Sequence, residues 1–317
     1  MRKLALFIFC VIPFLFYSQV QEYTPKVRLA METYAFLKGQ SAALEMVSRQ
    51  FPALKPDVKE AEKKLVVLFK PAEQNIEHFL KDELGDSDFN ILGKRIDSLL
   101  NKQLKIPIEK EKYARDFIAK VRERSRIISD TLLLKGIMSF AYHNAPHKEV
   151  TDGHVKIFTT KDHPKAEKTA LKIPIPKSWV AEEAEMPETI KQFTSYCGYG
   201  SEKMLIVVYD LPAEQYNFIL NEKSISEILS PQTNLIRSEL VTIDGRQGMM
   251  IEVEETLDHT YGKMKIRMLQ FMFVENQKLY CLQGSIGPVE VDENLELQIK
   301  KYEPLFRIIA FNTQIDN

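Results

Sequence analysis

The stretches MMIEVEET at 249–256 and KMKIRMLQFMFV at 263–274 decide the fold of the second half of this chain. Folding one back on the other about the loop at 258–262 predicts an antiparallel hairpin in which charges face opposite charges and apolar side chains face each other. A shift of one residue would destroy both matches, because it turns every side chain to the other face. The register that we predict pairs Glu254 with Lys265, Glu252 with Arg267, Val253 with Ile266 and Ile251 with Met268.

Turn signals on either side extend this hairpin into an antiparallel meander. The tight-turn dipeptide at 244–245 joins it to a strand at 240–243, and a turn at 276–277 joins it to a strand at 279–285. Other runs are typical of strands at 155–159, 171–175, 192–197, 203–210 and 309–313. Helical patterns lie at 224–229 and at 293–308, where Pro304 should kink or end the helix.

The first half of the chain has the apolar spacing of helices. Prolines and Gly85 separate the predicted segments, which are 27–51, 57–84, 86–100 and 109–128, the last extending as far as Leu132 in one interpretation. The predicted fold class is therefore α+β, with an N-terminal helical domain at 19–150 followed at 151–317 by an antiparallel sheet flanked by helices. The mature length of about 300 residues fits two domains.

The N-terminal sequence predicts a secretory signal peptide at residues 1–18. Arg2 and Lys3 precede an almost wholly apolar run at 4–16, which is too short to span a bilayer, and we place the cut after Ser18. The alternative is a short anchor that is never cut. Lipidation at Cys10 is not expected, because Phe9 precedes it. The chain should then be exported, periplasmic or secreted, with no transmembrane segment in its mature part.

Residues 154–314 resemble the PsbP-like superfamily, which includes DcrB-like periplasmic proteins. The resemblance rests on the segments LKIPIPKSW at 171–179, DGRQG at 244–248 and QKLY at 277–280, followed by a closing helix with Phe306 and then Phe311. The resemblance implies an antiparallel sheet covered by helices on both faces. It also implies an accessory or protein-binding role, and no catalytic residue can be carried over from it.

Several function classes find no support in the sequence. The formal net charge of -1 gives no global basic field for nucleic acid. Signatures of serine hydrolases, zinc peptidases and cysteine nucleophiles are missing from the printed sequence. Since Gly198-Tyr199-Gly200 stands alone, it predicts a turn rather than a phosphate-binding loop. We therefore predict no cofactor and no catalytic residue.

Three aromatic residues and two cysteines are the candidate site residues. Trp179, Tyr196 and Tyr199 could line a ligand groove, or Trp179 could instead be a core residue at the edge of the sheet. Export permits a disulfide between Cys197 and Cys281, although both could instead be buried small apolar residues.

The histidines near residue 150 are a weaker candidate. His143 and His147 have the i, i+4 spacing of a zinc-binding pair, and His154 follows them. Pro146 stands between the first two, so a regular helix is not expected there, and an ordinary polar connector is the favoured interpretation. We predict no metal site.

The leading functional hypothesis is an exported accessory or binding protein that acts by contact with an envelope protein or a small ligand. The alternative is an envelope hydrolase whose active site is dispersed along the chain. A third hypothesis is metal handling through the connector histidines.

Overall fold

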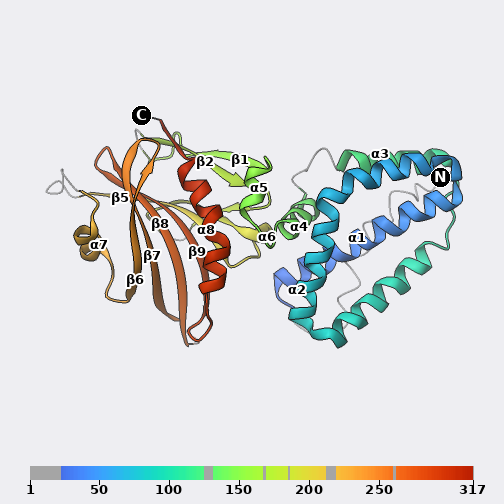
Figure 1. The fold of residues 1–317 in the computed structure, drawn as a ribbon, viewed down its shortest axis with the longest axis horizontal. Coiled ribbons are helices and arrows are strands. Elements are labelled where there is room, and N and C mark those ends of the chain that lie inside the picture. Colours follow the sequence, from blue (N-terminus) through green and yellow to red (C-terminus); the bar gives the residue numbers. More distant parts are fainter. Residues whose placement is uncertain are drawn as a thin grey trace. The chain divides into compact units, whose positions relative to one another are not determined.

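The computed structural model describes residues 23–124, 131–166, 169–184, 186–211, 219–259 and 262–316. The chain divides into two compact units, the first ending at His143 and the second beginning at Asn144 (Figure 1). The sequence placed this boundary near residue 150. The expected signal peptide at 1–18 lies outside the described residues.

Helices make up the first unit, as predicted. They are α1 (Pro25–Gln50), the short 3-10 helix η3 (Pro52–Leu54), α2 (Lys55–Gln103), α3 (Glu111–Arg124) and α4 (Leu132–Ala141). Gly85 has φ 75° and ψ 161° inside α2, a left-handed backbone conformation that glycine adopts readily. The predicted helix end at Gly85 is therefore a change of direction within α2 (Figure 1).

Helix α4 was not predicted as a separate element. It begins after Thr131, whose hydroxyl accepts a hydrogen bond from the amide of Leu134. A Cβ atom on Gly136 would lie 2.9 Å from Thr33 Oγ1, so the glycine allows α4 to approach α1 closely. Across the described ranges, no helix combines the length and the apolar character that crossing a bilayer requires.

Two antiparallel sheets form the framework of the second unit and confirm the α+β prediction. The seven-stranded sheet has the order β3 (Val180–Glu182), β4 (Thr189–Thr194), β5 (Glu202–Asp210), β9 (Lys278–Glu290), β8 (Gly262–Glu275), β7 (Arg246–His259) and β6 (Thr233–Ile243). The three-stranded sheet has the order β1 (Val155–Thr159), β2 (Ala170–Pro176) and β10 (Gln314–Asp316). The helices are α5 (His147–Thr151), α6 (Ser195–Gly198), α7 (Glu222–Ile228) and α8 (Glu296–Phe311).

The β7–β8 hairpin forms, but the predicted register is wrong by two residues. Glu254 lies opposite Arg267, and Val253 lies opposite Met268. A shift of two keeps every side chain on its face, and Arg267 still reaches both Glu254 and Glu252, so the charge pattern fits either register. The strands pair as far as His259 and Gly262, so the connection between them is shorter than the loop at 258–262 that the prediction assumed.

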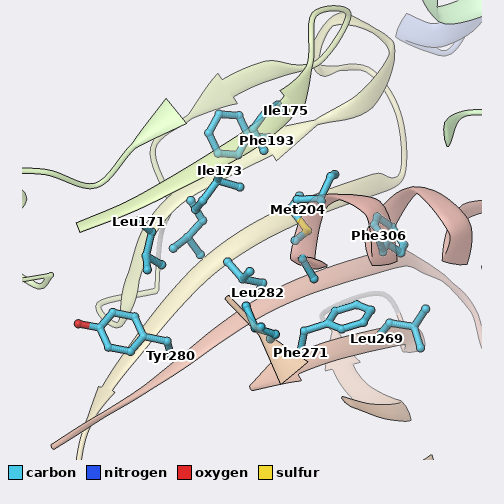
Figure 2. Packing of buried hydrophobic residues seen from close by; sticks show 14 of the residues in the cluster. Leu171, Ile173, Ile175, Phe193, Met204, Leu269, Phe271, Tyr280, Leu282 and Phe306 are labelled. Atoms are coloured by element: carbon cyan, nitrogen blue, oxygen red, sulfur yellow. The ribbon is translucent and has the colours of Figure 1, made fainter. Parts of the chain in front are cut away.

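Helix α8 covers one face of the large sheet and α7 covers the other. Buried residues from both sheets and α8 form the larger core (Figure 2), including Leu171, Ile173, Met204, Leu269, Phe271, Tyr280, Leu282 and Phe306. On the other face, Ile225 of α7 belongs to a second buried cluster with Val207, Met249 and Met272. The sheet therefore carries helices on both faces.

Pro304 does not end α8, although an end there was one of the two predicted outcomes. The helix continues to Phe311, although an interior proline removes one backbone hydrogen bond and costs ~3 kcal/mol or more. Leu305, Phe306 and Ile309 follow the proline and are fully buried. Burying a large apolar side chain contributes roughly 1.5–3 kcal/mol, so this packing offsets the loss.

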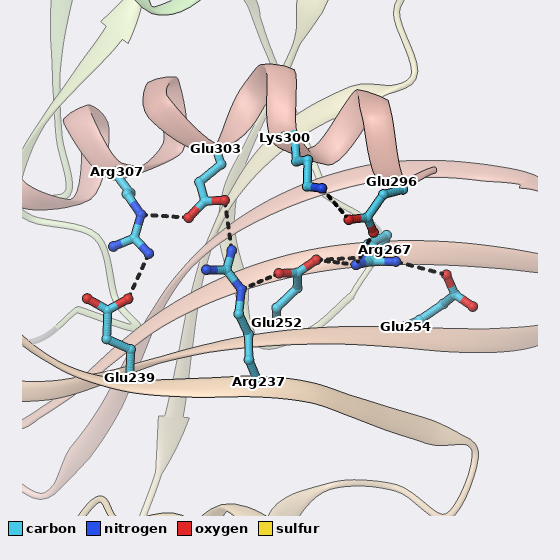
Figure 3. Close-up of polar contacts among 9 residues, drawn as sticks. All are labelled: Arg237, Glu239, Glu252, Glu254, Arg267, Glu296, Lys300, Glu303 and Arg307. Atoms are coloured by element: carbon cyan, nitrogen blue, oxygen red, sulfur yellow. Dashed lines mark hydrogen bonds and ion pairs between the residues drawn. The ribbon is translucent and has the colours of Figure 1, made fainter. Parts of the chain in front are cut away.

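Ion pairs connect α8 to strands β6 to β8 (Figure 3). The Glu252 carboxylate, nearly fully buried, lies between Arg237 Nε and Arg267 Nη2, at 2.5 Å from each. Arg237 also contacts Glu303 on α8 at 2.7 Å, and Arg267 contacts Glu296 at 3.0 Å. The buried carboxylate is thus paired on both sides, as burial of a charge requires.

The contact between Phe306 and Gly284 predicts a steric test. A Cβ atom on Gly284 would lie 2.3–2.6 Å from ring atoms of Phe306. We expect Gly284→Ala to lower the free energy of unfolding by about 1–3 kcal/mol, measured by urea denaturation. Combining it with Phe306→Leu makes room for the methyl group, so the double variant should lose less than the sum of the two single losses. Additive losses would contradict the packing described here.

Candidate functional site

Seven polar side chains meet at the end of the large sheet where β4 turns into β5. We call them the polar cluster, and they are Glu149, Ser178, Ser195, Tyr196, Glu202, Gln298 and Tyr302. They come from α5, the turn after β2, α6, β5 and α8. All except the half-buried Gln298 are at most 3% exposed. Buried polar groups at this density require hydrogen bonds among themselves.

Glu149 forms the first half of the cluster. Its Oε1 accepts a hydrogen bond from the Ser178 amide at 2.8 Å, and its Oε2 accepts one from the Ser178 hydroxyl at 2.7 Å. Burial raises the pKa of Glu149 to about 7, although the hydrogen bonds from Ser178 and the charge of Lys156 act in the opposite direction. The group therefore titrates near neutral pH.

Glu202 forms the second half. The Ser195 hydroxyl donates to its Oε2 at 2.5 Å, and Gln298 Nε2 donates to its Oε1 at 2.7 Å. A Cβ atom on Gly200 would lie 1.7 Å from Ser195 Oγ and 2.7 Å from Glu202 Oε2. Only glycine leaves room for this hydrogen bond, which explains part of the Gly198-Tyr199-Gly200 sequence.

Two tyrosines complete the cluster. Tyr196 and Tyr302 are hydrogen-bonded to each other, and burial followed by the nearby charge of Glu202 raises the pKa of both hydroxyls well above the usual value. Both tyrosines therefore stay protonated at any physiological pH, and one hydroxyl donates its hydrogen bond to the other.

The loop at 195–201 has an unusual backbone. Tyr196 has φ 46° and ψ 48°, Cys197 has φ 60° and ψ 28°, and Gly198 has φ 93°. The strand predicted at 192–197 therefore ends at Thr194. Left-handed conformations cost roughly 1–3 kcal/mol for each residue other than glycine and persist only where the surroundings enforce them.

Backbone hydrogen bonds hold this loop together with the cluster. The Cys197 amide donates to the Ser178 carbonyl at 3.3 Å, and the Gly200 amide donates to the Ser195 carbonyl at 3.1 Å. Ser178 and Ser195 also donate their hydroxyls to the two buried carboxylates. The same two residues thus connect the loop backbone to the buried charges.

The three aromatic candidates do not line one groove. Trp179 is 3% exposed and belongs to the larger core, and Tyr196 is 2% exposed within the polar cluster. Tyr199 is 44% exposed. Of these three aromatic residues, only Tyr199 has an exposed side chain.

The structure contains no disulfide between Cys197 and Cys281, and both side chains are buried. Cys281 lies in β9 with Val207 and Met272 on the face that α7 covers, whereas Cys197 lies in the 195–201 loop. Burial raises the pKa of the Cys281 thiol to about 12, which leaves it unreactive.

The histidine candidates do not converge on a metal. The ring of His143 packs on Phe79 in the first unit, with 6.3 Å between centroids. His147 and His154 belong to the second unit, where burial and then the charge of Lys177 lower the pKa of His154. Within the parts of the chain that the structure describes, no group of three or more His, Cys, Asp or Glu residues could hold a metal ion.

Sequence reasoning missed most of the polar cluster. Glu149, Ser178, Glu202 and Tyr302 have no common spacing, because the fold collects them from four separate elements. The one local signal was Gly198-Tyr199-Gly200, which we interpreted as a turn after a strand. The turn exists, but its role beside buried carboxylates depends on the tertiary structure.

The titration of Glu149 predicts a pH dependence of stability. Its folded-state pKa, about 7, lies above the ordinary value of 4.5, so the native state binds the proton more tightly than the unfolded state does. The stabilising contribution of protonated Glu149 is complete below the ordinary pKa of 4.5 and is lost as the pH rises through about 7. We expect Glu149→Gln to remove up to about 3 kcal/mol of the loss of stability between pH 4.5 and 8.

Urea denaturation across that pH range measures the effect. The control is Glu293→Gln, an exposed glutamate, which should keep the pH profile of the wild type. Parallel profiles for wild type and Glu149→Gln would contradict the assignment.

Comparison with known proteins gives structural neighbours only. No protein-family model and no curated protein matches this sequence. The solved structure of cyanobacterial PsbP (CyanoP) from Synechocystis sp. has a TM-score of 0.34 and 14% identity, covering 51% of this chain and 93% of that chain. LpqN of Mycobacterium tuberculosis, described as involved in cell envelope biogenesis, has a TM-score of 0.32 and 10% identity, covering 55% and 98%.

A third neighbour, from Bacteroides thetaiotaomicron, has a TM-score of 0.32 and 11% identity, and covers 52% of this chain and 49% of that chain. The similarity concerns the C-terminal part of the chain. The neighbours include a PsbP protein, a member of the superfamily that residues 154–314 resemble.

Proposed function

We propose that this protein is exported and works as an accessory protein that binds a protein partner through the 195–201 loop, with Tyr199 as the main contact. Export rests on Arg2, Lys3 and the apolar run at 4–16, which have the order of a secretory signal. The binding role rests on the geometry of the loop.

The observation that carries the proposal is the pair of left-handed residues, Tyr196 and Cys197, which Gly198 separates from the exposed Tyr199. Such strain is found mainly where a loop must present a side chain in one geometry. Here the strain is maintained by the hydrogen bonds that Ser178 and Ser195 make on both sides of the loop. A preorganised loop loses little conformational entropy on binding.

The chemistry of the exposed side chain favours a protein partner. A tyrosine offers a large, rigid contact area and one hydroxyl, and tyrosines are enriched at protein interfaces. Ser201, two residues after Tyr199, is half-buried, and its hydroxyl oxygen accepts a hydrogen bond from Gln298 Nε2 at 3.4 Å. Polar groups of this kind suit the rim of a protein contact.

The hydrolase alternative is less well supported. Ser178 and Ser195 would be its nucleophile candidates, but each is at most 2% exposed and donates its hydroxyl to a buried carboxylate. A nucleophile has to reach a substrate carbonyl. These hydroxyls instead donate hydrogen bonds to the buried carboxylates beneath the loop.

Partner capture from the native cell envelope tests the binding role. Tagged wild type should crosslink to a partner, and Tyr199→Ala should reduce that yield by about tenfold, the effect typical of a central tyrosine. The matched control is Tyr209→Ala on β5, because that side chain is 46% exposed. An unchanged yield for Tyr199→Ala would refute the assignment.

Intact mass tests the export step separately. Protein purified from its native host should lack residues 1–18, with the new N-terminus at Gln19 to within a few residues. Retention of Met1 to Ser18 in the purified chain would refute export by cleavage.

A further inference from the structure

The large sheet ends in a long edge strand. Within the described residues, β6 spans Thr233–Ile243 and pairs with β7 on one side only. The strand at the opposite edge, β3, covers just Val180–Glu182. An edge strand of this length presents a row of backbone donors and acceptors that can template another strand.

The sequence of β6 is complementary to itself. Residues at equal distances from Ser238 match each other: Arg237 and Glu239 have opposite charges, and Ile236 and Leu240 are both apolar. We propose that two copies of this chain associate by antiparallel pairing of β6 about a two-fold axis at Ser238. The pairing places Ile236 opposite Leu240 of the second copy and Arg237 opposite Glu239 of the second copy, each twice.

The side chains needed for this pairing are accessible. Leu240 is 63% exposed and Ile236 is 39% exposed, which is unusual for large apolar residues on a strand whose neighbour β7 is buried. Because a second β6 would bring these residues together, the pairing removes from water the apolar surface that the edge leaves uncovered.

The charges lie on the same side of the strand. Arg237 contacts Glu252 and Glu303, and Glu239 contacts Arg307, all toward α8 (Figure 3). The side chains of Arg237 and Glu239 are nevertheless 41% and 49% exposed. In the pair, Arg237 of each copy approaches Glu239 of the other and joins the two ion-pair networks.

A β-bulge limits the length of the contact. The pairing of β6 with β7 shifts between Leu235 and Arg237, so Ile236 has no residue directly opposite on β7. Regular pairing with the second copy is therefore centred on 237–239, with the contacts between Ile236 and Leu240 at its two ends. A contact this short predicts a reversible dimer rather than an obligate one.

A second copy fits this edge better than a foreign strand. The charge order Arg-Ser-Glu at 237–239 matches itself only in the antiparallel direction about Ser238. In the two-fold symmetric dimer the free β6 edges of both copies are paired with each other. The assembly is therefore a closed dimer rather than an open filament.

Sedimentation of the full-length mature chain over a concentration series tests the association. We expect a reversible dimer for the wild type, and a dissociation constant raised at least about tenfold in Leu240→Lys, where two lysines replace the apolar pairs. The control is Leu297→Lys on α8, whose side chain is 82% exposed and lies outside the proposed contact. A monomeric wild type, or equal dimerisation of Leu240→Lys, would overturn the proposal.

A cysteine probe tests the register and does not depend on how strong the dimer is. Opposite Cα atoms in an antiparallel pair lie about 4.5–5.5 Å apart, within the range of a disulfide. Ser238→Cys should therefore form a covalent dimer under oxidising conditions, seen on a non-reducing gel. Thr242→Cys, exposed and four residues from the axis, should stay monomeric on the gel. Absence of the Ser238→Cys crosslink, or equal crosslinking of both variants, would overturn this register.

Discussion

Burial of the Glu149 and Glu202 carboxylates is the constraint on which the candidate site depends. Removing a carboxylate from water costs several kcal/mol unless hydrogen bonds replace the lost hydration. Ser178, Ser195 and Gln298 supply those bonds. Because Ser178 and Ser195 also hold the backbone of the 195–201 loop, the cost of burial and the cost of the left-handed residues are met by the same contacts.

Helix α8 links this site to the rest of the second unit. Its first turns supply Gln298 and Tyr302 to the polar cluster, and its later turns seat Phe306 on Gly284. Glu303 of the same helix pairs with Arg237 on the edge strand β6. The position of α8 on the sheet therefore determines both the support of the loop and the charges displayed at the edge.

Local patterns predicted most of the strands, because these carry their own signal. They missed the short β3, and the strand predicted at 309–313 is wrong, since α8 continues to Phe311 and β10 spans Gln314–Asp316. The strand at 155–159 and the turn at 244–245 need only neighbouring residues to be recognised. The β7–β8 register failed by two residues because Arg267 satisfies either arrangement. Nothing local identified the polar cluster, since Glu149 and Tyr302 meet only after the sheet and α8 have packed. The sequence also does not predict the left-handed backbone conformation of Tyr196, because tyrosine does not favour it.

Amide hydrogen exchange at the 195–201 loop tests the central claim most directly. If buried hydrogen bonds hold the loop in its strained conformation, the amides of Cys197 and Gly200 will exchange about as slowly as that of Leu205 in the adjacent strand β5. Ser195→Ala should release that protection while Leu205 keeps its own. Exchange of the Cys197 and Gly200 amides at the rate of an unstructured peptide in the wild type would contradict the account.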